Sequence, residues 1–137
     1  MTKNSILFVI AMFNLTIASA QVKLEKIKGS KIVTVTTKEV ESFENVEIEE
    51  FLDVYFVKSE KTSIEIEADD NLHDIISYNV LGNTLKLTAL KQPTGEKKLA
   101  IRVNYNDSLK TIVARHESKI NALADISLEN ITIKNFD

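Results

Sequence analysis

Acidic, amide and imidazole side chains gather between Asp69 and Asp74, where the sequence reads DDNLHD. Such groups bind divalent cations or transfer protons. Calcium loops place oxygen ligands at alternating positions around a glycine, and zinc sites usually draw on several His or Cys ligands. The whole sequence has two His and no Cys, and the segment from Asp69 to Asp74 has no glycine. We therefore predict a short helical turn here, with Asp70 or Asn71 as its N-cap.

The apolar residues of the same segment support a helical turn. Leu72, Ile75 and Ile76 have the i, i+3, i+4 spacing of one buried helical face. On that pattern His73 and Asp74 point away from the core. The segment is expected to serve structure, and we predict no metal, cofactor or catalytic residues in it.

Paired carboxylates are the next candidates for chemistry. Glu47 with Glu49, and Glu65 with Glu67, each share one face of an alternating segment. Two such pairs could perform acid–base work on a glycan. The simpler interpretation is the solvent face of a strand, protected against edge pairing by charge.

Two further groups of residues, the run 115–118 and the three tyrosines, could also carry a function. The run 115–118, Arg-His-Glu-Ser, holds nucleophile, base and acid types in a row. Neighbours on a strand point to opposite faces, so the run cannot converge as a catalytic triad does. Tyr55, Tyr78 and Tyr105 could form a sugar-stacking surface or pack at the margin of the core.

The first twenty residues have the pattern of a signal peptide. Lys3 supplies positive charge, residues 6–17 are mostly apolar, and Ala18-Ser19-Ala20 has the small residues of a cleavage site. We predict an exported protein whose mature chain begins at Gln21 and has no membrane span, because the apolar segment is shorter than a spanning helix. An uncleaved N-terminal anchor is the alternative. The periplasm, the outer-membrane surface and the medium all remain open as destinations.

Composition limits the partners. Residues 21–137 suffice for one domain with a core. The formal net charge is −3, or −4 without Lys3, which argues against nucleic acid and anionic lipid. With no cysteine, stability must come from packing or from a bound ion.

Most of the chain after residue 30 alternates apolar and polar residues, as strands do. Glu50 breaks the alternation of 46–56, so we predict a turn or bulge near Glu50-Phe51. Gly82-Asn83 predicts a hairpin near residues 78–90. Residues 91–98, with Pro93 and Gly95, are the one clear predicted loop, and 104–108 is a predicted turn. The expected strands are 31–37, 46–49, 52–56, 63–68, 85–87 and 99–103.

The last thirty residues consist of short apolar pairs separated by polar residues, with a change of parity at Asn130. This texture fits coils of a β-solenoid, and a β-sandwich is the alternative. An open solenoid end is a sticky edge, so the chain is either a fragment or is covered there by a partner or a second copy. The residues expected to face inward are Ile112, Ala114, Ile120, Ile126, Leu128, Ile131 and Ile133.

Residues 29–90 resemble the bacterial head-GIN-domain family, also called auto-transporter adhesins. The resemblance rests on the order of several short elements: Gly29-Ser30, the Thr-rich 31–37, and Val40, Phe43 and Val46. Then Phe51-Leu52-Asp53 stands in place of a Gly-Ile-Asn/Asp triad, before Val54-Tyr55. Residues 66–72, with Asp69-Asp70-Asn71, match a V-E-A-D-x-N-L segment, and 82–87 match a G-x-L-K-I segment.

The resemblance implies an exported bacterial protein of the cell envelope with an all-β, right-handed parallel β-helix-like fold. It implies no catalytic residues and no cofactor. It marks Phe51, Leu52, Asp53, Asp69, Asp70 and Asn71 as motif positions without an assigned role. Phe51 departs from the glycine of the triad, and the region after residue 90 is shorter than is usual. These departures favour a shortened or incomplete member.

Three functions follow as hypotheses. The first is a non-enzymatic, adhesin-like module that binds a glycan or an envelope protein. The second is an enzyme acting on polysaccharide. The third is a structural envelope protein that self-associates through its C-terminal edge.

Overall fold

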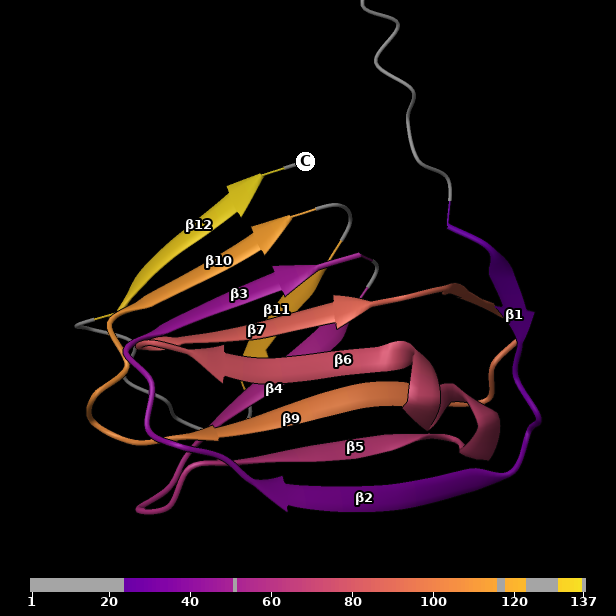
Figure 1. Ribbon diagram of the computed structural model, residues 1–137, viewed down its shortest axis with the longest axis horizontal. Coiled ribbons are helices and arrows are strands. Elements are labelled where there is room, and N and C mark those ends of the chain that lie inside the picture. The colour runs from indigo at the N-terminus through magenta and orange to yellow at the C-terminus, as the bar shows by residue number, and fades with distance from the viewer. Residues whose placement is uncertain (1–23, 51, 116–117, 123–130, 137) are drawn as a thin grey trace, which may run out of the picture.

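The computed structural model describes residues 24–50, 52–115, 118–122 and 131–136, and in these the chain is all-β with one short 3₁₀ helix (Figure 1). The all-β class predicted from the sequence is confirmed. The elements are β1 (Lys26–Lys28), β2 (Val33–Glu39), β3 (Asn45–Glu49), β4 (Asp53–Lys58), β5 (Ser63–Asp69), η1 (Asp70–Ile75), β6 (Ile76–Leu81), β7 (Thr84–Ala89), β8 (Gln92–Thr94), β9 (Leu99–Tyr105), β10 (Thr111–Arg115), β11 (Lys119–Ala122) and β12 (Thr132–Phe136).

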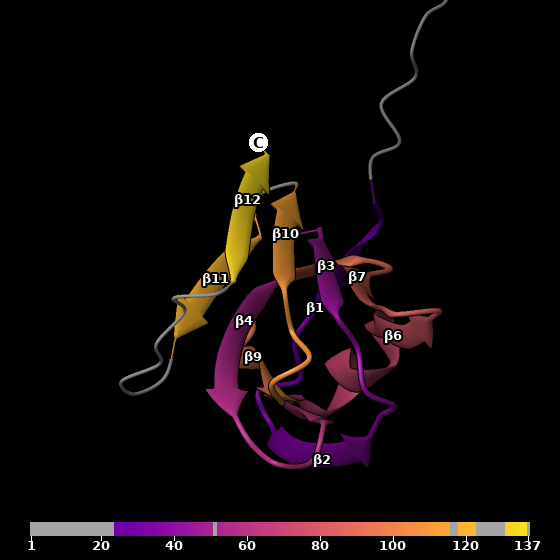
Figure 2. The same cartoon turned by 90° about the vertical axis from the view of Figure 1, so that its left-hand side faces the viewer.

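The strands form two large sheets that face each other (Figures 1 and 2). The first sheet has the order β12-β10-β3-β7-β6, and the second has the order β11-β4-β9-β5-β2. A small third sheet pairs β1 with β8. We call the first two the upper sheet and the lower sheet.

Parallel pairing follows the same sequence order in both large sheets. In the upper sheet β7, β3, β10 and β12 are neighbours in parallel, and in the lower sheet β9, β4 and β11 are. The remaining ladders of the large sheets, β2–β5, β5–β9 and β6–β7, are antiparallel. The large sheets thus contain both parallel and antiparallel ladders, and the antiparallel β6–β7 ladder is the hairpin predicted near residues 78–90.

One apolar cluster lies between the two large sheets. Alternate residues of the central strands, such as Val46 and Ile48 of β3 and Val54 and Phe56 of β4, are at most 1% exposed. This is the period-two pattern on which the strand predictions rested. Leu72 and Ile75 of η1 are also buried, as the helical spacing predicted.

The turns agree with the local sequence in part. β6 and β7 form the predicted hairpin through Gly82-Asn83, and Gly82 has a φ of 60°. Glu50 has a φ of 65°, which places a turn between β3 and β4, as predicted. The loop predicted over 91–98 is wrong in part, because Gln92–Thr94 forms β8 against β1. Pro93 has no N–H to donate, and the neighbouring Gln92 N–H donates to the Glu25 carbonyl at 2.8 Å.

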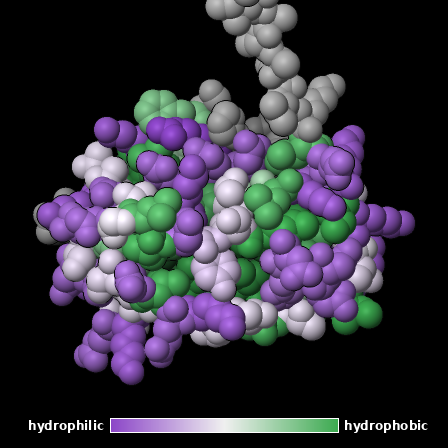
Figure 3. Space-filling view, in the orientation of Figure 1, coloured by the Kyte–Doolittle hydropathy of each residue, from purple (hydrophilic) through white to green (hydrophobic). Residues whose placement is uncertain are grey.

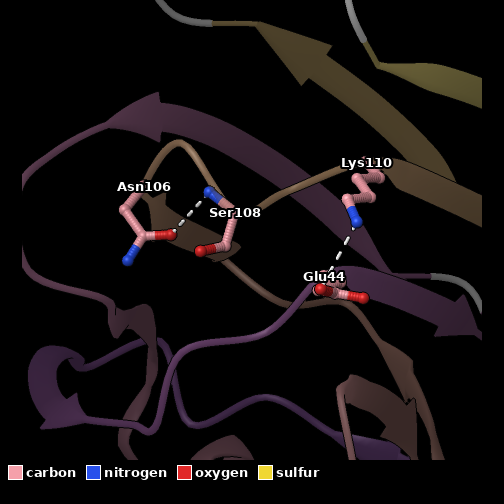
Figure 4. A network of polar contacts seen from close by, with 4 residues as sticks. All are labelled: Glu44, Asn106, Ser108 and Lys110. Atoms are coloured by element: carbon pink, nitrogen blue, oxygen red, sulfur yellow. Dashed lines mark hydrogen bonds and ion pairs between the residues drawn. The ribbon is translucent and has the colours of Figure 1, made fainter.

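A polar network fixes the turn between β9 and β10, within the segment where a turn was predicted (Figure 4). The Asn106 side chain accepts a hydrogen bond from the Ser108 N–H at 3.0 Å. The Lys110 N–H donates to the Glu44 carbonyl at 2.7 Å, and the Lys110 ammonium lies 3.4 Å from the Glu44 carboxylate. These contacts seat β10 beside β3.

The described C-terminal strand lies at one edge of the upper sheet. Ile112 and Ala114 are buried as predicted, and Ile120 and Ile131 pack against the core. Ile133 lies on the inward side of the sheet, as predicted, but it is 44% exposed. It pairs with Ile112, but β12 is the last described strand of its sheet. Ile126, Leu128 and Asn130 lie outside the described residues.

Exposed apolar side chains are spread over several elements. Figure 3 shows one face, where hydrophobic patches alternate with hydrophilic side chains. Such scattered exposure is ordinary for a protein surface. No helix among the described residues is long and apolar enough to span a bilayer. The largest exposed hydrophobic residues are Ile32, Val35, Leu81, Leu90, Ile133 and Phe136.

Candidate binding face and the motif residues

The outward face of the lower sheet carries a row of polar side chains around one aromatic ring. Strand register aligns five residues from five neighbouring strands across this face. Side chains aligned in this way lie within contact distance of their neighbours. From β11 to β2 the row consists of Asn121, Tyr55, Arg102, Glu65 and Thr37.

A hollow of about 200 Å³ opens beside this row, over Ala100 of the central strand β9. Ala100 faces outward, two residues before Arg102, and pairs with Glu67 of β5. Its side chain is a single methyl group, whereas the side chains around it are long, so Ala100 forms the floor of the hollow and the longer side chains form its walls. The lining residues are Tyr55, Glu65, Glu67, Lys98, Ala100 and Arg102.

The walls of the hollow carry balanced charge. Arg102 lies 3.5 Å from Glu65 in a partly exposed ion pair, and Glu67 and Lys98 add one charge of each sign. The Tyr55 hydroxyl donates to Asp53 at 3.4 Å, and the Asn121 amide donates to the other oxygen of that carboxylate. The site therefore offers hydrogen-bond donors and acceptors around a half-buried ring, with little net charge.

A second and larger hollow, of about 540 Å³, lies among turns. Lys58 and Asp107 form an ion pair of 2.7 Å beside it, and this hydrogen bond and charge raise the pKa of Lys58. Its lining has no aromatic residue and, apart from Lys58 at the end of β4, comes from turns, so it is the weaker candidate for a binding site. Its remaining lining residues are Ser59, Glu60, Asn106 and Ser108.

Asp69 is a fully buried carboxylate that holds three segments together. One oxygen accepts the Lys31 N–H at 2.9 Å, and the other accepts the Lys98 N–H at 2.9 Å; the Lys97 N–H reaches both, at 3.0 and 3.1 Å. Burial would raise the pKa of Asp69, but these N–H groups and the charge of Lys31 lower it from its usual 3.8.

Gly29 is needed where the Asp69 carboxylate meets the chain. A Cβ at Gly29 would lie 2.2 Å from Asp69 Oδ2 and 2.8 Å from the Glu96 Cα. No side chain can be placed at those distances without movement of the backbone. Two parts of the family motif, Gly29-Ser30 and the later segment that contains Asp69, thus pack directly against each other.

Asp70 and Asn71 also bind the segment that precedes β2. The Asn71 side chain accepts from the Ser30 N–H at 2.9 Å and donates to the Lys28 carbonyl at 2.8 Å. The Ser30 hydroxyl donates to Asp70. The predicted N-cap at Asp70 or Asn71 is wrong, because η1 has Asp69 at its N-cap position with no side-chain cap bond. Long-range partners compete successfully for these side chains.

His73 and Asp74 differ from each other in role. Asp74 is exposed, as predicted. His73 is half-buried, and its Nε2 lies 3.1 Å from the Thr34 carbonyl and 2.9 Å from the Thr34 hydroxyl. The segment thus attaches to β2 and serves structure. Within the described residues, no three His, Cys, Asp or Glu side chains are grouped as metal ligands would be.

Leu52 and Asp53 form a second motif cluster, apart from the first. Leu52 is 1% exposed; its N–H donates to the Ser118 hydroxyl at 3.3 Å and its carbonyl accepts from the Lys119 N–H at 2.8 Å. These bonds dock β11 beside β4. Phe51 lies outside the described residues, and the left-handed backbone next to it falls on Glu50.

The three tyrosines do not share a surface. Tyr55 faces outward on β4, whereas Tyr105 is 3% exposed and packs on Phe56 with ring centroids 6.3 Å apart. Desolvation raises the pKa of Tyr105. Tyr78 lies on β6 of the upper sheet and packs against the core. Only Tyr55 is placed for stacking on a ligand.

The carboxylate pairs also separate. Glu47 and Glu49 belong to the upper sheet, and Glu65 and Glu67 to the lower sheet. Glu49 pairs with Arg115 at 3.4 Å. Ser118 is buried in its bond to Leu52, and residues 116–117 lie outside the described residues. No joint acid–base site is formed by these pairs.

Sequence reasoning missed Ala100, Lys98 and Asn121 as members of a site. Alternation placed Ala100 and Arg102 on the outward face of their strand, and that signal was available. The register that brings Tyr55 and Asn121 beside them joins strands far apart in the chain, and no local pattern encodes it.

Comparison with solved structures shows the same fold in bacterial proteins. A structure of a "putative adhesin" from Bacteroides fragilis has a TM-score of 0.66 and 23% identity over 79% of this chain and 51% of that one. A "putative lipid binding protein" from Parabacteroides distasonis gives 0.62 and 16%, over 72% and 44%. A "putative adhesin" from Parabacteroides merdae gives 0.60 and 20%, over 72% and 42%.

The chain therefore spans about half the length of these structures. No match was found among curated proteins. Residues 42–135 match the family described as "Putative auto-transporter adhesin, head GIN domain", which covers more than half of the chain. The chain belongs to the head-GIN-domain family.

Proposed function

We propose that this protein is an exported, non-enzymatic binding module of the bacterial envelope, whose ligand is a glycan. Family membership supports an adhesin-like role. The observation that carries the glycan is the outward row of the lower sheet, where Tyr55 is flanked by Asn121 and Arg102. An aromatic ring beside amide, guanidinium and carboxylate groups suits a ligand that has both apolar faces and hydroxyls.

The proposal includes a solenoid arrangement of the parallel strands. Strand pairs β7/β9, β3/β4 and β10/β11 each place one strand in the upper sheet and one in the lower sheet, in matching order. We regard each pair as one coil, with β12 beginning another, and expect the coils to wind in a right-handed sense. Stacked coils give an extended lateral face, which suits a polymer.

Export is proposed on the N-terminal pattern described above. Removal of residues 1–20 would leave Gln21 as the first residue. The intact mass of protein recovered from a periplasmic or secreted fraction tests this directly. A mass that includes residues 1–20 would contradict cleavage at that position.

The binding proposal is tested on a broad glycan array with the full chain purified after export. We expect binding to one class of glycan, equal with and without calcium. Calcium independence is expected because both oxygens of Asp69 already accept backbone N–H groups. An array with no reproducible binding would overturn the glycan as ligand.

A second candidate function, self-association, rests on β12. This strand is at the edge of the described upper sheet, all five of its residues are exposed, and Ile133 and Phe136 are apolar. Exposed edges of this kind recruit further strands. Light scattering of the full chain should then show a dimer or larger species that Ile133→Lys dissociates. A monomer at high concentration would contradict this function.

A further inference from the structure

We propose that the hollow over Ala100 is a subsite for a single uncharged pyranose ring, with Tyr55 as its stacking platform. This inference rests on the proposed function and deepens it, because it assigns the place and the chemical class of the bound unit. The hollow of about 200 Å³ is of the size of one sugar ring.

The floor of the subsite determines its shape. Ala100 is the one lining residue with a side chain of a single carbon, and it belongs to β9, the middle strand of the lower sheet. β4 and β5 flank β9 on either side and supply Tyr55, Glu65 and Glu67. A backbone paired on both sides is held rigidly, so the walls are positioned before a ligand arrives.

The groups of the walls match a sugar. A pyranose presents C–H groups on one face, which stack on an aromatic ring, and hydroxyls around its rim. Each hydroxyl both donates and accepts a hydrogen bond. Glu65 and Glu67 can accept, and Arg102 and Lys98 can donate, around the same opening. Tyr55 is itself held by its bond to Asp53, which in turn accepts from Asn121.

The charge of the subsite favours a neutral sugar. Two carboxylates and two cations line it, so an acidic sugar would be repelled by Glu65 and Glu67 as well as attracted by the cations, and a sugar of either charge gains no net attraction. A neutral ring meets no such repulsion. Its binding should therefore depend weakly on salt, whereas the binding of a charged sugar is screened by added salt.

The experiment measures two ligands in parallel with the full chain. The first is the glycan that binds best on the array. The second is a panel of methyl glycosides of glucose, galactose, mannose and N-acetylglucosamine, whose binding is measured by NMR titration. A monosaccharide has few atoms, so a dissociation constant of about 1–10 mM is expected for the best of them. Added salt should change this constant less than about twofold.

Four variants separate the subsite from the fold. Ala100→Leu fills the hollow at an outward strand position and should abolish binding. Tyr55→Ala should weaken binding at least about tenfold, whereas Tyr55→Phe keeps the ring and should stay within about threefold. Thr88→Leu adds the same side chain to the outward face of the upper sheet and should have no effect. Circular dichroism and thermal unfolding check that each variant is folded.

The outcomes separate the two proposals. Loss of both ligands in Ala100→Leu and Tyr55→Ala, with Thr88→Leu unchanged, is the expected result. If glycan binding by the wild type persists undiminished in the folded Ala100→Leu and Tyr55→Ala variants, the subsite is overturned and the glycan-binding function stands. If the wild type binds no glycan on the array and no glycoside of the panel, the function is overturned together with the subsite.

Discussion

Asp69 illustrates how one side chain can join parts of the chain that lie far apart in sequence. Its carboxylate accepts hydrogen bonds from backbone N–H groups of the segment before β2 and of the segment before β9, and it packs directly on Gly29. A buried carboxylate is stable only with such partners. The acidic segment that first suggests metal chemistry is thus a structural joint.

The first prediction concerns Asp69→Asn. The amide would direct N–H donors at backbone N–H groups, so we expect a clear drop in Tm at pH 7. Because the pKa of Asp69 is lowered in the folded protein, its carboxylate stabilises the fold fully above about pH 3.8, and this stabilisation is lost as the pH falls through the pKa of the folded state. The difference in unfolding free energy between wild type and variant should therefore shrink below pH 4.

Asp70→Asn is the matched control for this series. Asp70 is exposed, and its side chain accepts only from the Ser30 hydroxyl among the described residues. Its substitution should change Tm little. Equal losses in the two variants, or a difference for Asp69→Asn that stays constant from pH 7 to pH 2.5, would contradict the role given to Asp69.

Glu50 carries a second prediction at the residue scale. Its φ of 65° costs an L-residue about 1 kcal/mol, which glycine would not pay. Glycine also raises the conformational entropy of the unfolded chain, which lowers the free energy of unfolding by about 0.4–1 kcal/mol. Glu50→Gly should therefore leave stability unchanged or raise it by up to about 0.5 kcal/mol. Glu50→Ala removes the same side chain but keeps the strain.

Urea unfolding of the two variants provides the measurement. Glu50→Gly should be the more stable of the pair, although glycine is normally the poorer residue in a folded chain. If Glu50→Ala proves more stable than Glu50→Gly, the backbone at this turn does not have the left-handed conformation described here.

At the scale of elements, β1 and β8 form a small sheet whose attachment depends on Gly29. Gly29 N–H donates to the Thr94 carbonyl at 3.0 Å, which extends the pairing beyond β1. Gly29→Ala would force Cβ into the Asp69 carboxylate and the Glu96 backbone. We expect a loss of about 1–3 kcal/mol, as for other overpacked positions.

Lys28→Ala is the control for Gly29→Ala, since Lys28 is exposed at the end of β1 and directly precedes Gly29. Urea denaturation of both variants is the measurement, and the midpoint should fall for Gly29→Ala alone. A Gly29→Ala variant as stable as Lys28→Ala would show that the close approach of Gly29 to Asp69 is absent in solution.

The elements also show how far the sequence predicts this fold. Alternation in 63–68 and the Gly82-Asn83 turn are local signals, and both predictions were confirmed. β8 was read as a loop because Pro93 and Gly95 outweigh a three-residue strand whose partner, β1, is far away in the chain. The candidate binding site could not be predicted from the sequence for the same reason, because Ala100 and Tyr55 are neighbours only through the register of β9 with β4.

At the scale of the whole molecule, two sheets enclose one apolar core and turn their outward faces to solvent. The two outward faces are unlike each other. Both carry charged pairs in register, such as Glu47 and Lys86 of the upper sheet, but the ring of Tyr55 and the hollow over Ala100 belong to the lower sheet. We therefore assign ligand binding to the outward face of the lower sheet.

The most direct test of that assignment is a map of amide chemical-shift changes in the ¹⁵N-labelled full chain, titrated with the glycan selected on the array. We predict that the largest changes fall on the middle of β4, β5 and β9, around Tyr55, Glu67 and Ala100. Changes concentrated on β3, β7 and β10 of the upper sheet, or no changes at saturating glycan, would contradict it.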